Sequence, residues 1–382
     1  MEVLYRGFDG LDFSLQGQIG PDLEKELKAA KAEAQRRHDS VMLDWNGIKL
    51  HVAETGAQGG YAYRANTGDF GATWFFKSPN GRDPWGIRVS CNSLLLATYG
   101  IGEAQNRLYK TLECLGVRIH KDGESIGRVD YAIDLLAPAF ELIPNQFVMH
   151  SNSIRADYIE QSDMSVHGKS GRVTSVTVGK MPGRQVIIYD KRADVLAKGK
   201  VASWEIWNAT RAHHGLVPLN SDNPQLSRVW RAEIRAGKKH LKDHWNIRSW
   251  RDLAERCGDM FAASACAIRH TDPGNDSNRS RWPDSSFWSQ VRSELEGDLF
   301  EMRSFAEPNL VKDVHQEAHN QLLKTQTIGL LTTRAAICRV DANGLPRFVE
   351  LAGIEMANEI ENAPEFFAEK LRKAAARYSI YD

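Results

Sequence analysis

The chain is organised around the stretch QVIIYDK, which runs from Gln185 to Lys191. β-branched and aromatic residues dominate this stretch, and such a composition predicts a β-strand. Successive side chains of a strand face opposite ways, so Ile187, Tyr189 and Lys191 are expected to share one face. A tyrosine hydroxyl beside a lysine amine could be a nucleophile with its electrostatic helper, or simply the end of an amphipathic strand.

Two further segments, 125–135 (SIGRVDYAIDL) and 229–235 (VWRAEIR), also alternate between apolar and polar residues. Each predicts a strand with one face toward a core and one polar face. The segment 172–178 (RVTSVTV) is expected to pair with 185–191 as a hairpin. Chemistry-capable side chains gather on the polar faces of these strands, namely Arg128, Asp130, Asp134, Tyr189, Lys191, Arg231, Glu233 and Arg235.

Three of these side chains are carboxylates, from Asp130, Asp134 and Glu233. Carboxylates sharing a strand face either hold a cation or stay solvated, since burying uncompensated charge is costly. Hard oxygen ligands suit Mg²⁺ or Mn²⁺ better than zinc. The sequence therefore predicts a site in which such an ion polarises a phosphodiester, tyrosine attacks phosphorus, and basic side chains offset the developing charge.

The same residues carry a resemblance to a known family. The chain resembles the Rep_trans-type rolling-circle replication initiation factors, which include plasmid initiators, filamentous-phage-like replication proteins and relaxases of integrative elements. The family pattern has an R-x-D-x-A-x-D strand, a threonine-to-glycine segment, a Y-D-K strand and an R-x-E strand. These stand here, in the same order, as Arg128 to Asp134, Thr174 to Gly179, Tyr189 to Lys191, and Arg231 to Glu233.

The resemblance covers about residues 40–245 and implies roles for individual residues. It implies Tyr189 as the nicking and joining nucleophile, with Lys191 as its electrostatic helper at the phosphate. It implies Asp130, Asp134 and Glu233 as metal ligands, with Asp12 as a further candidate. It also implies a fold related to the HUH nucleases, although no H-x-H motif is present.

The expected fold class is α+β, with an antiparallel sheet core, flanking helices, two pseudo-repeated halves and a mainly helical C-terminal region. The pattern indicates a catalytic domain over 1–248, with its core at 40–245, and a helical region over 249–382. A helix starting at Ser249 is expected to open that region, which could bind DNA or a partner.

Overall composition is that of an ordinary soluble protein, with 42% apolar residues and a formal net charge of +0. Charge is uneven, because 180–251 holds fifteen Lys and Arg against six Asp and Glu. This basic segment predicts a surface for DNA phosphates. Its candidate ligands, together with a basic side chain from the 125–135 strand, are Arg128, Arg231, Arg235, Lys238 and Lys239.

Five scattered cysteines without a C-x-x-C motif favour a reducing cytoplasm, and we expect neither a signal peptide nor a membrane span. The favoured interpretation is a metal-dependent, site-specific DNA nickase and strand transferase. It would start rolling-circle replication or transfer of a plasmid, phage or integrative element. Its partner would be origin DNA with a single-stranded or cruciform nick site; a host helicase and a homodimer are further candidate partners. The alternatives are a non-catalytic DNA-binding regulator on the same scaffold, and an unrelated protein whose polar strand faces are only solvated.

Aromatic side chains pose a last question for the sequence. Trp74, Phe75, Trp245 and Trp250 could stack on unpaired bases, or they could pack in the core of the protein. Strand and helix patterns around them favour core packing.

Overall fold

The computed structural model describes residues 1–80, 83–150, 155–156, 163–300 and 302–378. The chain divides into two compact units, Met1–Pro308 and Asn309–Asp382. Each unit is described by itself.

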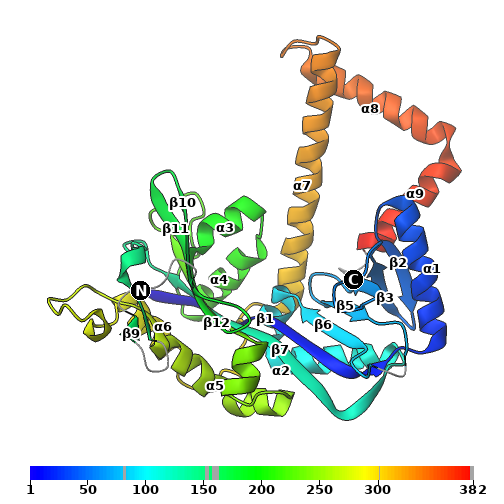
Figure 1. Ribbon diagram of the computed structural model, residues 1–382. Helices are drawn as coiled ribbons and strands as arrows, with labels where there is room; N and C mark the ends of the chain where they lie inside the picture. The colour runs from blue at the N-terminus through cyan, green and yellow to red at the C-terminus, as the bar shows by residue number, and fades with distance from the viewer. Residues whose placement is uncertain (81–82, 151–154, 157–162, 301, 379–382) are drawn as a thin grey trace. The chain divides into compact units, whose positions relative to one another are not determined.

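The first unit is built on strands joined by helices and short helical turns (Figure 1). Its strands are β1 (Glu2–Gln18), β2 (Val41–Trp45), β3 (Ile48–Val52), β4 (Tyr63–Asn66), β5 (Ala72–Phe76), β6 (Ile87–Cys91), β7 (Arg118–Leu136), β8 (Phe147–His150), β9 (Arg155–Ala156), β10 (Met164–Lys169), β11 (Arg172–Gly179), β12 (Arg184–Asp190), β13 (Val229–Gly237) and β14 (Ile268–His270). Its helices are α1 (Pro21–Arg37), α2 (Ser93–Cys114), α3 (Lys191–Lys198), α4 (Ala202–His213), α5 (Trp250–Ala267) and α6 (Ser286–Ser293). Short turns of helix lie at Pro144–Gln146, His240–His244 and Arg279–Arg281.

Eleven strands form one sheet in the order β10-β11-β12-β13-β7-β1-β6-β5-β4-β3-β2. Neighbouring strands in this sheet pair antiparallel, so the predicted α+β class with an antiparallel core is confirmed. The two longest strands, β1 and β7, run side by side at its centre (Figure 1). Apart from Asp12 on β1, the residues that the sequence assigned to chemistry lie on β7, β12 and β13, or just after them.

One face of these central strands is apolar and packs against helices. Tyr131 of β7 contacts Phe8 of β1 edge-on, with ring centroids 5.3 Å apart, and Phe261 of α5 at 5.5 Å. All three rings are almost fully buried. Because side chains alternate along a strand, burying this face turns Asp130, Asp134 and their neighbours to the other.

Helix α5 begins where the sequence predicts, with Ser249 as its N-cap. The Ser249 hydroxyl accepts a hydrogen bond from the Asp252 amide, and the Asp252 carboxylate accepts one from the Ser249 amide in return. Phe261 of α5 and Trp288 of α6 belong to the same buried core as the sheet. The first compact unit therefore extends to Pro308, well past the boundary expected at 248, because these helices cover the apolar sheet face.

The predicted hairpin is present as β11 and β12, but the second strand ends at Asp190. The Asp190 side chain accepts a hydrogen bond from the Ala193 amide at 2.9 Å and so caps α3. Lys191 is the first residue of that helix rather than the last residue of the strand. The alternation that grouped Lys191 with Ile187 and Tyr189 therefore stops one residue earlier.

The segment 141–150, expected as a helix, contains only the turn Pro144–Gln146 followed by β8. Phe147 and Val148 are buried, and β8 pairs with β14 in a separate three-stranded sheet. Pairing with a distant strand outweighs local helical preference here. The strand expected at 155–160 is β9 at Arg155–Ala156, and its remaining positions lie outside the described residues.

The sheet order bears on the expected pair of repeated halves. On one side β1 is followed by β6 to β2, and on the other β7 is followed by β13 to β10. The helices break this likeness, since α1 directly follows β1 whereas α3 and α4 lie between β12 and β13. Strand order alone does not establish a repeat.

The second unit consists of helices, as expected for the end of the chain. They are α7 (Pro308–Ile337), which begins at the boundary, α8 (Leu345–Asn362) and α9 (Pro364–Tyr378). Within the described part of the chain, no helix combines the length and apolar character needed to cross a membrane.

Candidate functional site

The polar face of the central strands carries a row of register partners. Tyr189 of β12 lies opposite Arg231 of β13, Arg231 opposite Asp134 of β7, and Asp134 opposite Tyr5 of β1. Directly opposed residues of an antiparallel pair place their side chains on the same face, within contact distance. The sequence named three of these four residues, and the sheet brings them together.

Arg231 and Asp134 make the strongest contact in this row. The Arg231 Nε and Nη2 atoms donate to the two Asp134 carboxylate oxygens at 2.6 and 2.9 Å. Arg231 Nη1 donates to Asp9 Oδ1 at 2.6 Å, and Trp207 Nε1 of α4 donates to Asp134 Oδ2 at 2.8 Å. Asp134 is fully buried and Arg231 almost so. We call Tyr189, Arg231, Asp134, Asp9 and Lys191 the tyrosine cluster.

Charge pairing in the tyrosine cluster shifts the pKa values of Arg231 and Asp9. Burial alone would lower the pKa of Arg231, but attraction to Asp134 and Asp9 raises that pKa well above its ordinary value. Burial would likewise raise the pKa of Asp9, but Arg231 and Lys191 lower it. Both groups are therefore held in their charged forms.

Burial is the main cause of the pKa shifts of Tyr189 and Lys191. Burial raises the pKa of Tyr189 well above its ordinary value; Arg231 opposes this rise and Glu233 adds to it. The Lys191 amine lies 5.8 Å from the centroid of the Tyr189 ring. Burial, and then the positive charge of Arg231, lower the pKa of Lys191 to about 8. Lys191 is thus a cation whose proton is held weakly, next to a tyrosine that resists ionisation.

A second group of charges lies farther along the same face. Arg128 donates to both carboxylate oxygens of Asp130 at 3.0 and 2.5 Å. Arg235 donates to Glu233 at 2.6 Å and also lies 3.8 Å from Asp130. Burial, and then the nearby charge of Glu233, raise the pKa of Asp130 to about 6, although Arg128 opposes this rise. We call these four residues the arginine–carboxylate cluster.

Gly10 allows Asp130 to occupy its place in this cluster. Gly10 is the register partner of Asp130 on β1, and a Cβ atom there would meet Asp130 Oδ2 at 2.6 Å. The Asp9-Gly10 pair has the composition of a turn, yet it lies inside the long strand β1. Glycine at this position therefore makes room for the Asp130 carboxylate, and it does not form a turn.

The three carboxylates predicted as metal ligands are divided between the two clusters. Asp130 and Asp134 are four residues apart on one strand, which separates their Cα atoms by roughly 13 Å. Two ligands of one ion must bring their oxygens within about 4 Å of each other, because each lies about 2.1 Å from the ion. Over the described ranges, no three or more His, Cys, Asp or Glu side chains are grouped so that they could hold a metal ion. The set Asp130, Asp134 and Glu233 therefore does not fit a single Mg²⁺ or Mn²⁺ ion in this geometry.

The residues predicted to bind DNA phosphates fall into three settings. Arg231 is buried and its three guanidinium nitrogens donate to carboxylates. Arg128 and Arg235 are partly exposed but paired with acids. Lys238 and Lys239 are exposed immediately after β13, where the Lys239 amide donates to the Pro182 carbonyl of the hairpin loop. Only the two lysines are open to a ligand without breaking an ion pair.

Several contributors were missed from the sequence. Asp9 was not singled out from the sequence, and Trp207 gave no signal, because it lies on a helix remote in sequence from Asp134. Asp12, the further metal candidate, pairs with Arg88 at 3.2 Å.

The structure gives the burial of all four aromatic side chains that the sequence singled out. Trp74 and Trp250 are buried in the core, as the pattern favoured, while Phe75 is partly exposed. The Arg88 guanidinium lies 5.2 Å from the Phe75 ring centroid. Trp245 is partly buried against the core.

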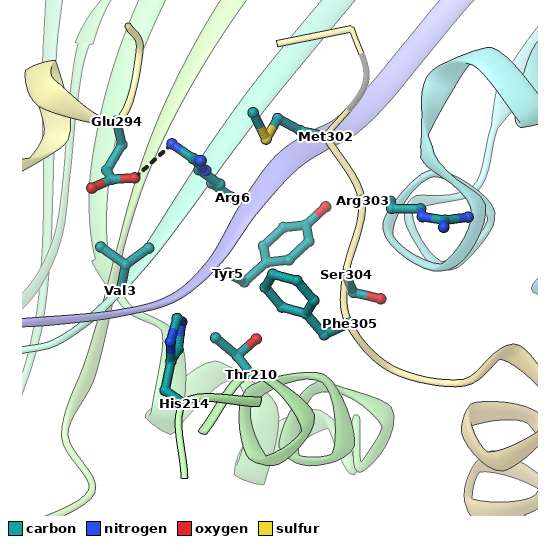
Figure 2. Close-up of a pocket in the computed structure, with 10 residues that line it drawn as sticks. All are labelled: Val3, Tyr5, Arg6, Thr210, His214, Glu294, Met302, Arg303, Ser304 and Phe305. Atoms are coloured by element: carbon teal, nitrogen blue, oxygen red, sulfur yellow. Dashed lines mark hydrogen bonds and ion pairs between the residues drawn. The ribbon is translucent and has the colours of Figure 1, made fainter. Parts of the chain in front are cut away.

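A cavity of about 310 Å³ adjoins the tyrosine cluster at Tyr5 (Figure 2). The Arg231 guanidinium lies 5.7 Å from the centroid of the Tyr5 ring. Figure 2 shows the ion pair of Arg6 and Glu294 at this cavity, at 2.8 Å. Thr210 of α4 and His214, which directly follows that helix, also line the cavity. Tyr5 thus lies between the tyrosine cluster and this cavity, whose lining is partly apolar.

The sequence matches no protein-family model, and no curated protein matches it. Among solved structures, the chain is similar to a rolling circle replication initiator protein from Geobacillus stearothermophilus. The two share 14% identity with a TM-score of 0.38, over 78% of this chain and 97% of that chain. Likeness at this level establishes neither a common fold nor a common activity, so the resemblance read from the motifs stays a prediction.

Proposed function

We propose that this protein cuts and rejoins DNA strands, with Tyr189 as the nucleophile. The observation that carries the proposal is the position of Tyr189, partly exposed and directly opposite Arg231, with the Lys191 amine 5.8 Å from its ring centroid. Tyrosine is a weak nucleophile at its ordinary pKa and needs activation by its surroundings.

The chemistry starts with attack of the Tyr189 oxygen on a phosphorus atom of the DNA backbone. A new bond joins tyrosine to phosphorus, and the bond from phosphorus to one deoxyribose oxygen breaks. That oxygen leaves with the bonding electrons and takes up a proton, which gives a free hydroxyl. The phenol proton passes to solvent before or during attack, and reversal of the same steps by another hydroxyl rejoins a strand.

Lys191 is the residue we propose to stabilise the transition state. Its charge is needed where negative charge develops on the phosphoryl oxygens. Arg231 is less able to serve, because Asp134 and Asp9 already offset its charge. Its role is to hold Tyr189 and Asp134 in one row, which makes it a positioning residue.

The finer parts of the proposal are site-specific nicking at an origin and initiation of rolling-circle replication or transfer. The basic segment around β12 and β13 supports a DNA partner, and Lys238 and Lys239 offer exposed charge there. The Mg²⁺ or Mn²⁺ requirement remains a prediction of the sequence. Since the three predicted carboxylates do not fit one ion, no step is assigned to a metal.

The test is formation of a covalent protein–DNA adduct with supercoiled and single-stranded DNA that carries candidate origins, with and without Mg²⁺ or Mn²⁺. We expect an adduct that is absent in Tyr189→Phe. The variant removes only the hydroxyl, so equal thermal stability of the two proteins is the control. An adduct of equal yield in Tyr189→Phe, or none from the unmodified protein on any substrate, would contradict the proposal.

A second candidate function is a DNA-binding regulator without catalysis. It is favoured by the pairing of all three predicted metal-binding carboxylates with arginines, which a purely structural network would also show. It predicts salt-sensitive DNA binding that neither divalent ions nor Tyr189→Phe alters. Adduct formation separates it from the first proposal.

A further inference from the structure

A cavity of about 530 Å³ lies where β12 gives way to α3, and no part of the proposed chemistry uses it. Its lining joins segments that are distant in sequence, since Arg172 begins β11, Arg192 lies in the first turn of α3, and Arg228 directly precedes β13. One acid, Asp190, lines it as well. Three arginines and one acid thus line the same cavity.

The carboxylate is already satisfied by protein. Asp190 Oδ2 accepts a hydrogen bond from Arg172 Nη2 at 2.6 Å, and Oδ1 accepts one from the Ala193 amide at 2.9 Å. Asp190 is almost fully buried, whereas the Arg172 side chain is 40% exposed. Arg172 and Asp190 therefore offset each other's charge, and Arg192 and Arg228 remain as an excess of two positive charges on the cavity lining.

Neutral groups hold Arg192 in place. Its Nε donates to the Ser227 hydroxyl at 3.0 Å, and its Nη2 donates to the Ser221 carbonyl at 2.8 Å. These acceptors orient the guanidinium but carry no charge to balance it. Fixing a donor before the ligand arrives lowers the entropy cost of binding.

Arg228 is still less engaged by protein. Its guanidinium carbon lies 5.7 Å from the centroid of the Trp230 ring. Within the described parts of the chain the Arg228 side chain makes no hydrogen bond or ion pair, and only its backbone carbonyl accepts one, from the Ala137 amide. Like charges gathered on one cavity repel each other unless an anion lies between them. Planar guanidinium groups suit the paired oxygens of phosphate better than a point charge does.

We infer that this cavity binds a phosphate group, carried by a nucleotide or by the backbone of a nucleic acid. An excess of two positive charges matches the charge of a phosphate monoester near neutral pH. The volume exceeds that of a phosphate ion and falls within the range of small-ligand pockets, so it leaves room for an attached sugar.

This phosphate would differ from the one that Tyr189 attacks. Asp190 follows Tyr189 in the chain, but the two side chains point to opposite faces of β12. The inference goes beyond the proposed function and stands without it, because it concerns binding and not strand cleavage.

The experiment is isothermal titration calorimetry of the full chain with four probes at one ionic strength, and with the oligonucleotide also at several salt concentrations. The probes are inorganic phosphate, thymidine 5′-monophosphate, thymidine, and an oligonucleotide of twelve thymidines. We expect the two small phosphates to bind and thymidine not to bind. In Arg228→Gln their affinity should fall about tenfold or more, because a charged hydrogen bond is lost.

Two controls keep the result specific. The Arg228 side chain makes no hydrogen bond within the described parts of the chain, and its backbone carbonyl keeps its bond from the Ala137 amide in the variant, so Arg228→Gln should fold normally. Thermal unfolding checks this. Arg251→Gln removes one charge from a side chain that is 86% exposed on α5, and it should leave the affinities for inorganic phosphate and thymidine 5′-monophosphate unchanged. Arg192→Gln should repeat the loss seen in Arg228→Gln.

The oligonucleotide identifies the source of the phosphate. If its affinity also falls in Arg228→Gln, and its log–log salt slope falls by about 0.7, the occupant is a nucleic-acid backbone. If its affinity is unchanged while the small phosphates bind more weakly, the occupant is a free nucleotide or phosphate. Both results support a phosphate site.

The inference is overturned if the unmodified chain binds no phosphate probe, or if both Arg228→Gln and Arg192→Gln bind phosphate and nucleotide as well as the unmodified chain does. Tyr189→Phe should bind every probe normally. A chain that forms no adduct with DNA but loses phosphate binding in Arg228→Gln would refute the proposed function alone.

Discussion

Arg231 and Asp134 face each other across β13 and β7 and share two hydrogen bonds of 2.6 and 2.9 Å inside a buried site. This pair joins the two strands that carry most of the predicted chemistry. It also explains why Arg231 is not available to DNA, since its guanidinium is used within the protein. The predictions below start from this pair and move outward along the polar sheet face.

Replacing Arg231 with methionine should lower the free energy of unfolding by about 3–5 kcal/mol, because the buried Asp134 and the partly buried Asp9 would lose their partner. Urea unfolding followed by tryptophan fluorescence measures this change. Arg251→Gln at its exposed site should change stability by no more than about 0.5 kcal/mol. A loss below about 1 kcal/mol in Arg231→Met would mean that the pair is hydrated and not buried.

Lys191 should impose a plateau on the dependence of strand cleavage on pH. Cleavage needs tyrosine without its proton and Lys191 with its proton, so the rate should rise with pH and level off above about 8, where Lys191 deprotonates. In Lys191→Arg the added guanidinium keeps its charge, and the rise should continue beyond pH 8.

Single-turnover cleavage between pH 6 and 10 tests the role of Lys191. Lys191→Met should be slow at every pH, and unchanged thermal stability is the control for all three proteins. A plateau at the same pH in Lys191→Arg would show that another group causes it.

Asp130 should make stability depend on pH. Its pKa is raised from 3.8 to about 6 on folding, mainly by burial, so the folded protein binds this proton more tightly than the unfolded chain. The resulting stabilisation is fully present below pH 3.8 and is lost as pH rises through about 6.

The variant Asp130→Asn has no titratable group at this position. The free energy of unfolding of the unmodified protein, relative to that of the variant, should therefore fall as pH rises from 4.5 to 7.5. The fall should be on the order of 1–3 kcal/mol. Urea unfolding at several pH values measures it, and Asp259→Asn at an exposed site on α5 is the matched control. A relative stability that rises with pH would reverse the assignment.

The separation of Asp130 from Asp134 predicts different effects on any divalent-ion requirement. Asp134 binds Arg231 and Trp207, so Asp134→Asn should lower stability but leave the Mn²⁺ concentration for half-maximal cleavage unchanged. Titration of cleavage with Mn²⁺ in Asp134→Asn, Asp130→Asn and Glu233→Gln gives the comparison. An equal increase in all three would indicate that the acids act together on one ion in the DNA-bound protein.

The strands that carry the predicted site were recognisable from sequence because burial of one face leaves a two-residue period. Trp230, Ala232 and Ile234 alternate with Arg231, Glu233 and Arg235 in this way. All six residues lie on the strand β13, as the sequence predicts. The N-cap at Ser249 was recognisable for a similar reason, since a capping box is local. The segment 141–150 was not, because its strand depends on pairing with β14, more than a hundred residues away.

The sequence by itself determined which residues alternate on the central strands and therefore which side chains share the polar face. It also contained the spacing that keeps Asp130 and Asp134 apart, because four residues of strand span more than one ion can bridge. Only the tertiary structure decided the neighbours on that face. Strand order and register place Tyr189 beside Arg231, bring Asp9 and Trp207 to the buried charges, and gather Arg172, Arg192 and Arg228 around one cavity. Such contacts join distant segments, and no local pattern encodes them.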